Sequence, residues 1–138
     1  MLGEKIGEGT GKIIGQRVLS PEESGFGGTK IEVSVQESGK LLGVETTSFL
    51  SYWTLPREGG YLYGEGRGVT IAKDGESCSW RGTGIGKFTG RGLAATYRGS
   101  LFYEAKGSRF ARLNGTCVVF EFNVDEHGNT TGQLFEWK

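Results

Sequence analysis

The stretch 61–103 constrains the fold of this chain more than any other, because two turn signals divide it into three segments of alternating apolar and polar residues. The first signal is Asp74-Gly75, a dipeptide that favours a tight hairpin loop, and the second is Gly90-Arg91. Alternation with a period of two is typical of strands that bury one face. The stretch therefore predicts three neighbouring antiparallel strands with a shared dry face.

The same alternation recurs along most of the chain, and no window longer than a turn has apolar residues at helical spacing. About eight strands are predicted, over residues 4–18, 29–37, 40–55, 61–73, 76–89, 92–105, 114–124 and 131–137. Ser38-Gly39 is expected to form the turn between the second and third strands. A bulge near Thr46 is then needed, because Val44 and Phe49 are both apolar and lie an odd number of residues apart.

A sheet of eight strands with one apolar face and no helices to cover it must close on itself. The sequence therefore predicts one all-β domain over residues 1–138, an eight-stranded antiparallel up-and-down β-barrel. The chain has 26 glycines and only 2 prolines, with 12% aromatic residues. Within strands, such glycines mark sharp bends in the wall or places where a neighbouring large side chain needs space.

Charge and composition narrow the function classes. The 16 basic and 16 acidic residues cancel, so no net field draws the protein to nucleic acid or to a membrane. Residues 1–19 lack the apolar core of a signal peptide, and a cytoplasmic protein is expected. Cys78 and Cys117 are interpreted as reduced, small hydrophobic residues rather than a disulfide. No metal site and no cofactor is predicted.

The expected registers place two ionisable residues on the dry face. A two-residue Asp74-Gly75 loop pairs Ile71 with Cys78, and the same register puts Glu65 and Arg67 opposite glycines. An ionisable pair inside a barrel is costly unless it is paired, hydrogen-bonded or hydrated. Either the pair forms a structural salt bridge near a barrel mouth, or it holds a ligand.

In the ligand-binding interpretation, Glu65 is the candidate catalytic acid or base and Arg67 is its charge partner or an anion clamp. A mostly apolar pocket with a few convergent polar groups is the usual form of such a site. The neighbours expected to bind the ligand on this face are Ser51, Trp53, Tyr63 and Tyr97.

Other chemistry-bearing residues carry weaker signals. His127 lies in the turn-like segment 125–129, which favours a hairpin loop over a metal site. Cys78 has no histidine or other base on its face, so a core position is favoured over a nucleophile.

The segment 82–92, with the sequence GTGIGKFTGRG, resembles the glycine-rich hairpin of the allene oxide cyclase barrel superfamily, which includes the dirigent proteins. With its flanking strands, the resemblance covers about a third of the chain, and the whole chain is similar to members of an uncharacterised bacterial and archaeal family. It implies an eight-stranded barrel with an internal cavity, frequent dimers or trimers, and members that guide cyclisation or coupling of hydrophobic small molecules. No catalytic residue is carried over.

Three functions remain open: a barrel that binds a hydrophobic or amphipathic small molecule, a cofactor-independent cyclase or isomerase of a hydrophobic substrate, and an oligomeric structural module with a filled interior. An interior cavity of about 300 Å³ or more, the lower end for ligand pockets, favours the first two. A homo-oligomer is expected from the resemblance and from apolar residues such as Ile85 and Phe102 on the wet face.

Overall fold

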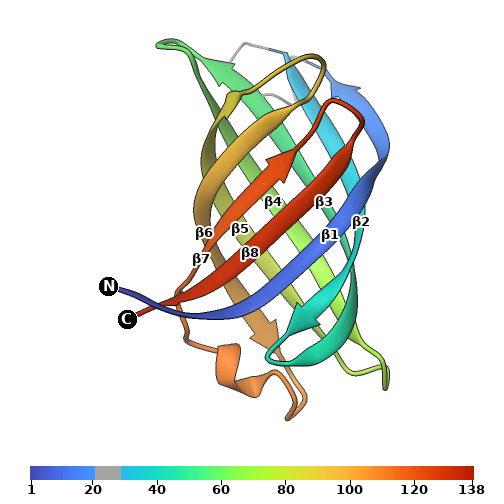
Figure 1. Ribbon diagram of the computed structural model, residues 1–138, viewed down its shortest axis with the longest axis vertical. Coiled ribbons are helices and arrows are strands. Elements are labelled where there is room, and N and C mark those ends of the chain that lie inside the picture. Colours follow the sequence, from blue (N-terminus) through green and yellow to red (C-terminus); the bar gives the residue numbers. More distant parts are fainter. Residues whose placement is uncertain (21–28) are drawn as a thin grey trace.

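The computed structural model describes residues 1–20 and 29–138, and its eight antiparallel strands form a closed barrel in chain order (Figure 1). The strands are β1 (Leu2–Leu19), β2 (Lys30–Leu41), β3 (Val44–Arg57), β4 (Tyr61–Ala72), β5 (Ser77–Phe88), β6 (Ala95–Ala105), β7 (Val118–Val124) and β8 (Asn129–Trp137), with a short 3-10 helix η1 (Ala111–Leu113) before β7. The predicted up-and-down barrel is confirmed. Among the described residues, no helix is long and apolar enough to cross a membrane.

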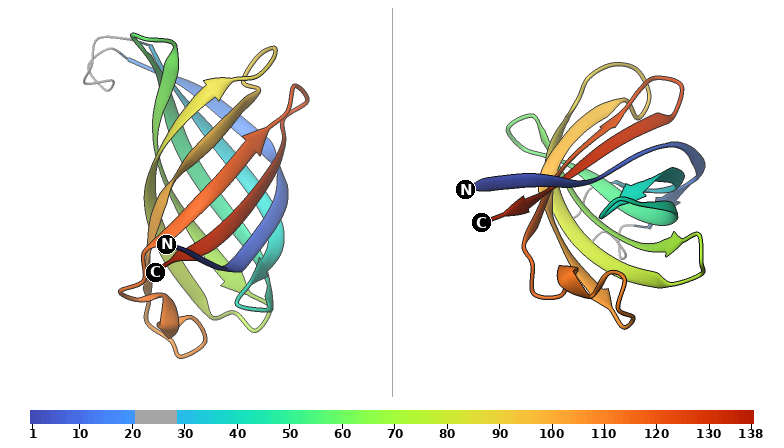
Figure 2. Two further views of the ribbon diagram at one scale, coloured as in Figure 1. Left: turned by 60° about the vertical axis from the view of Figure 1, so that its left-hand side comes forward. Right: turned by 60° about the horizontal axis from the view of Figure 1, so that its bottom comes forward.

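The two chain ends meet where the barrel closes, and they lie side by side in all views (Figures 1 and 2). β1 pairs with β2 on one side and with β8 on the other. The terminal amine of Met1 donates to the carbonyl of Lys138, and the Lys138 N–H donates to the carbonyl of Met1 at 2.7 Å. Closure pairs the strand edges that an open sheet would expose.

The β4–β5 turn differs from the prediction by one residue. The Ala72 N–H donates to the Glu76 carbonyl at 2.8 Å, and Gly75 has a φ of 92°, so the loop has three residues that end in a left-handed glycine. Asp74 fixes this loop by accepting the Glu76 N–H at 3.0 Å. Ile71 is therefore opposite Ser77 instead of the predicted Cys78. A slip of one residue turns every side chain of β4 to the other face of the wall.

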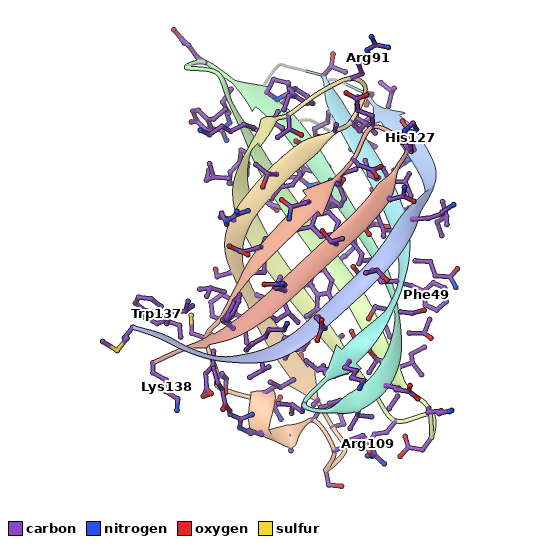
Figure 3. All side chains as sticks on the ribbon, viewed as in Figure 1. Phe49, Arg91, Arg109, His127, Trp137 and Lys138 are labelled. Atoms are coloured by element: carbon purple, nitrogen blue, oxygen red, sulfur yellow. The ribbon has the colours of Figure 1, made fainter. Side chains whose placement is uncertain are left out.

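The β7–β8 turn also shifts the predicted register by one residue, because the loop is shorter than the predicted loop over residues 125–130. The Asp125 N–H donates to the Asn129 carbonyl at 2.9 Å, and Gly128 has a φ of 80°. Val118 therefore lies opposite Glu136, where the sequence predicted Trp137. As a result Trp137 is exposed on the outside of the barrel (Figure 3).

The β2–β3 turn lies at Leu42-Gly43, where φ values of 51° and 78° fit a type I′ hairpin. The predicted Ser38-Gly39 turn is wrong, because both residues are inside β2. The β2–β3 pairing is continuous, so the expected bulge near Thr46 is absent from this described pair of strands. Ser48, Leu50 and Thr54 of β3 are consequently buried inside the barrel, and Phe49 points away from it (Figure 3).

The β3–β4 and β5–β6 registers each differ from the predicted register by two residues. A shift of two residues keeps each side chain on the same face of the sheet. In β3–β4, Trp53 lies opposite Glu65 instead of Tyr63. In β5–β6, Tyr97 lies opposite Gly86 instead of Gly84. The predicted interior face of β5 is therefore confirmed, although its partners are displaced.

Interior glycines make room for the large side chains of the next strand. A Cβ on Gly68 would lie 2.5 Å from the ring of Trp80, and one on Gly86 would lie 2.5 Å from Tyr97. Real Cβ atoms do not approach that closely, so these wall positions require glycine for space.

The β6–β7 connection closes one end of the barrel, at the bottom of Figure 1. Phe110 and Leu113 of this connection are fully buried in the largest core cluster. Arg109 forms an ion pair with Asp74, and its N–H donates to Glu76 Oε1 at 2.7 Å. These contacts hold the connection against the β4–β5 turn.

Candidate functional site

Five of the six residues predicted to line an interior site lie on the outer face. Glu65 and Arg67 are exposed, and Ser51, Trp53 and Tyr63 share their side of the wall. The prediction of a Glu65 and Arg67 site inside the barrel is therefore wrong, and the three-residue β4–β5 turn is the physical reason. Tyr97 alone of the six faces the interior, with 5% of its surface exposed.

The five outer residues are nevertheless neighbours. Ser51 pairs with Arg67 and Trp53 pairs with Glu65, while the rings of Trp53 and Tyr63 lie 5.6 Å apart. The Tyr63 hydroxyl donates to Glu65 Oε2 at 3.0 Å. Within residues 1–20 and 29–138, Glu65 and Arg67 do not form the expected salt bridge with each other.

The barrel interior contains a cavity of about 120 Å³. This volume is below the roughly 300 Å³ of typical ligand pockets. It approaches the size of an engineered apolar cavity of about 150 Å³ that binds benzene. Most of the lining is apolar. The residues that line the cavity from the inner face of the wall include Gly9, Glu37, Ser48, Leu50, Tyr52, Gly64, Thr70, Trp80, Gly84, Tyr97, Leu101, Tyr103, Phe120, Phe122, Gly132 and Leu134.

Glu37 brings a carboxyl group into this interior. In β2 it continues the inward row of Val33 and Val35, and it lies opposite Gly11 of β1 and Ser48 of β3. Its carboxyl carbon is 3.6 Å from the position that a Cβ on Gly9 would occupy. Burial raises the pKa of Glu37 to about 7.

The carboxyl of Glu37 has neither an ion-pair partner nor a side-chain hydrogen bond within the described residues. Buried carboxyl groups are normally paired or hydrogen-bonded. A polar group that faces a cavity and lacks such a partner is a candidate contact for a ligand or for water.

Sequence reasoning missed Glu37 because the Ser38-Gly39 pair next to it was interpreted as a turn. The sequence contains a pattern that places Glu37 inside, since Val33, Val35 and Glu37 occupy every second position of β2. A strand that continues through Ser38 puts all three on one face.

Three of the other polar side chains around the cavity, Ser48, Thr70 and Tyr97, have hydrogen-bond partners within the barrel. The hydroxyls of Ser48 and Thr70 are 2.8 Å apart, and the Tyr97 hydroxyl donates to Thr54 Oγ1 at 3.2 Å. The ring of Tyr52 packs edge-on against Tyr97, with centroids 5.7 Å apart. Burial raises the pKa values of Tyr52 and Tyr97, so both rings remain neutral near pH 7.

Thr130 adds a second unsatisfied polar group close to Glu37 along the wall. Both residues pair with Gly11, from β8 and from β2, so they flank that glycine. The Thr130 hydroxyl is buried and has no hydrogen-bond partner among the residues that the structure describes.

Two other sequence predictions are decided by the structure. Cys78 and Cys117 are free thiols, and burial raises the pKa of Cys78 to about 11, which disfavours a nucleophilic thiolate. His127 lies in the exposed β7–β8 turn (Figure 3), and its backbone N–H donates to Asp125 Oδ1 at 2.8 Å. The hairpin-loop interpretation of His127 is confirmed.

Comparison with solved structures supports the barrel. The chain is similar to a protein with unknown function from Clostridium acetobutylicum ATCC 824, with a TM-score of 0.79, 10% identity and 98% of each chain covered. It is also similar to a conserved protein of unknown function from Rhodopseudomonas palustris, with a TM-score of 0.78, 13% identity and coverage of 99% and 97%. No protein-family model and no curated protein matches the chain. At these identities the likeness defines the class as an eight-stranded barrel.

Proposed function

We propose that the barrel binds one small, mainly apolar molecule in its interior and that Glu37 contacts the polar group of that molecule. The observation that carries the proposal is a cavity-facing carboxyl without a charge or hydrogen-bond partner in the described chain. Leaving such a group unpaired costs stability, and a ligand that pairs with it recovers part of that cost.

The cavity volume and the carboxyl together define the class of ligand. A volume of about 120 Å³ suits a single small ring rather than a fatty-acid chain. In the described part of the chain, the acidic group in the interior is the carboxyl of Glu37, instead of the carboxylate and guanidinium of Glu65 and Arg67 that the sequence predicted, so an anionic ligand is disfavoured. We expect a compact aliphatic or aromatic molecule with one amine or other hydrogen-bond donor.

Calorimetric titration with three probes of one ring size tests this proposal. At pH 8, where the Glu37 carboxyl is ionised, cyclopentylamine should bind more tightly than cyclopentanol, and cyclopentanecarboxylate should not bind. E37Q should remove the preference for the amine, whereas E121Q, a change on the outer face, should leave it intact. Absence of binding of every probe to the wild-type protein contradicts the proposal.

The amine should also show a defined pH dependence. Ionised Glu37 is the binding form, and a pKa of about 7 leaves about one tenth of it ionised at pH 6 and about nine tenths at pH 8. The association constant of cyclopentylamine should therefore rise about tenfold between pH 6 and pH 8. A flat profile would mean that the ligand does not contact Glu37.

A second candidate function, catalysis by a cofactor-independent cyclase or isomerase, is favoured by the same residue. A carboxyl with a pKa near the working pH is suited to general acid–base chemistry. The resemblance of segment 82–92 to the allene oxide cyclase superfamily belongs to this proposal. Glu37-dependent exchange of the α-protons of cyclopentanone with deuterated water, followed by NMR, tests it, and an exchange rate equal to that of E37Q contradicts it.

The structural-module alternative has a clear signature. If the interior only supports the wall, no probe binds to the wild-type protein, and E37Q differs from the wild-type protein in stability alone. The cavity of about 120 Å³ favours a structural module over a protein that carries large ligands. We further propose a homo-oligomer, a dimer or a trimer, which the exposed apolar residues Phe49 and Val69 of the outer wall support. A cytoplasmic location is also proposed, because residues 1–19 lack the apolar core of a signal peptide.

A further inference from the structure

We propose a second, exterior site: the open groove across β2 to β6 binds a small molecule in which an oxyanion is attached to a planar ring. Arg67 of β4 and Arg81 of β5 lie directly opposite each other on this outer face. The groove has a volume of about 340 Å³. It lies on the other side of the barrel wall from the interior cavity, with which it shares the wall residues Tyr52, Glu65, Gly66, Gly82 and Thr83. The proposal does not depend on the function proposed for Glu37.

Two like charges directly opposite each other in a sheet destabilise it. Neither Arg67 nor Arg81 forms an ion pair within residues 1–20 and 29–138. An anion placed between the two guanidinium groups removes their repulsion and accepts hydrogen bonds from both.

The carboxylates that share the groove are engaged with other residues. Glu32 forms an ion pair with Arg17 at 3.5 Å, and Glu65 accepts the hydroxyl hydrogen of Tyr63 at 3.0 Å. Within the described chain, the groove therefore contains two guanidinium groups without an ion pair, one carboxylate that is ion-paired and one that is hydrogen-bonded to a tyrosine. This arrangement favours an exogenous anion over an internal salt bridge.

Aromatic side chains border the same groove. Phe102 of β6 lies opposite Arg81 and is 60% exposed, and Trp53 lies opposite Glu65. The hydroxyls of Ser51 and Thr83 are also in the lining. An apolar surface next to paired guanidinium groups complements a ligand whose ring packs on Phe102 while its oxyanion contacts the arginines.

Phenyl phosphate is the probe that combines both features. Its affinity, measured by calorimetry at low ionic strength, should exceed that of inorganic phosphate and of phenol, and it should fall as salt is added. Benzoate tests which kind of oxyanion the site prefers. If benzoate binds more tightly than phenyl phosphate, the site is assigned to carboxylates. If benzoate binds more weakly, the site is assigned to phosphate esters.

The variants R67Q and R81Q should each weaken phenyl phosphate binding at least tenfold without lowering the melting temperature, because each removes a like-charge contact. R98Q is the matched control, since Arg98 is an exposed arginine of the outer wall that pairs with Glu121. An equal loss in R98Q means general charge attraction and overturns the proposal, as does the absence of phenyl phosphate binding. E37Q should not change this affinity.

Discussion

The carboxyl group of Glu37 lies over Gly9, whose missing side chain leaves the space that the carboxyl occupies inside the barrel. Gly9 also pairs with Gly39 on one side and with Gly132 on the other, so three glycines in a row line this part of the wall. A larger residue at Gly9 or Gly132 would compete with Glu37 for the interior. A side chain at Gly39 would instead meet the backbone of Glu8 and Gly9. The row therefore allows an ionisable side chain at a position where the barrel would otherwise bury an apolar one.

The stability of the protein should fall as the pH rises from about 5 to about 7. The folded protein retains the Glu37 proton up to a pKa of about 7, whereas the unfolded chain releases it near 4.5. The folded state binds more protons between these values, so the free energy of unfolding decreases through this window, by about 3 kcal/mol at most. Urea unfolding at pH 5 and pH 8 measures the difference.

The E37Q variant is the control for this pH dependence. Glutamine fills the same space without titrating, so its free energy of unfolding should be nearly equal at pH 5 and pH 8. A wild-type profile that is equally flat over this range would mean that Glu37 titrates in water and does not face the cavity.

The substitution T130V should stabilise the barrel by about 1 kcal/mol, because it removes a buried hydroxyl that has no partner in the described chain and keeps the shape of the side chain. Thermal melting compares it with T131V, a change at the adjacent exposed position of β8. A lower melting temperature for T130V would show that the hydroxyl has a hydrogen-bond partner.

Gly84→Phe should lower the free energy of unfolding by about 1 to 3 kcal/mol. A Cβ at this position is already 3.1 Å from the ring of Phe120, so the interior cannot accept a second ring without displacement. Ile85→Phe, at the neighbouring outward position, should have little effect because Ile85 is half exposed. Equal melting temperatures of the two variants would contradict the assignment of the faces of β5.

We expect a homo-oligomer in solution, because Phe49 and Val69 lie directly opposite each other on the outer wall and are 46% and 41% exposed. Light scattering at micromolar concentration should give the mass of a dimer or a trimer. Phe49→Lys should shift the mass toward the monomer. A monomeric wild-type protein rules out this assembly.

The architecture could be predicted from alternation and glycine content, because closure is the only way to bury the apolar face of a sheet without helices. The faces of β4 and β8 could not, since each depends on the exact length of a turn that contains Asp and Gly: the sequence predicts a two-residue loop at Asp74-Gly75 and a loop over residues 125–130 between β7 and β8. In both turns, hydrogen bonds from backbone N–H groups to the Asp74 or Asp125 carboxylate stabilise a loop of three residues. The one-residue difference in the β4–β5 turn places Glu65 and Arg67 on the outer face of the barrel. The carboxyl group that faces the interior is that of Glu37.

The titration of the Glu37 carboxyl carbon by NMR tests the central claim most directly. In the free protein we predict a midpoint near pH 7, and a lower midpoint when cyclopentylamine is bound, because the ammonium group stabilises the carboxylate. A midpoint near 4.5 that does not respond to the amine would contradict both the buried position of Glu37 and the proposed binding site.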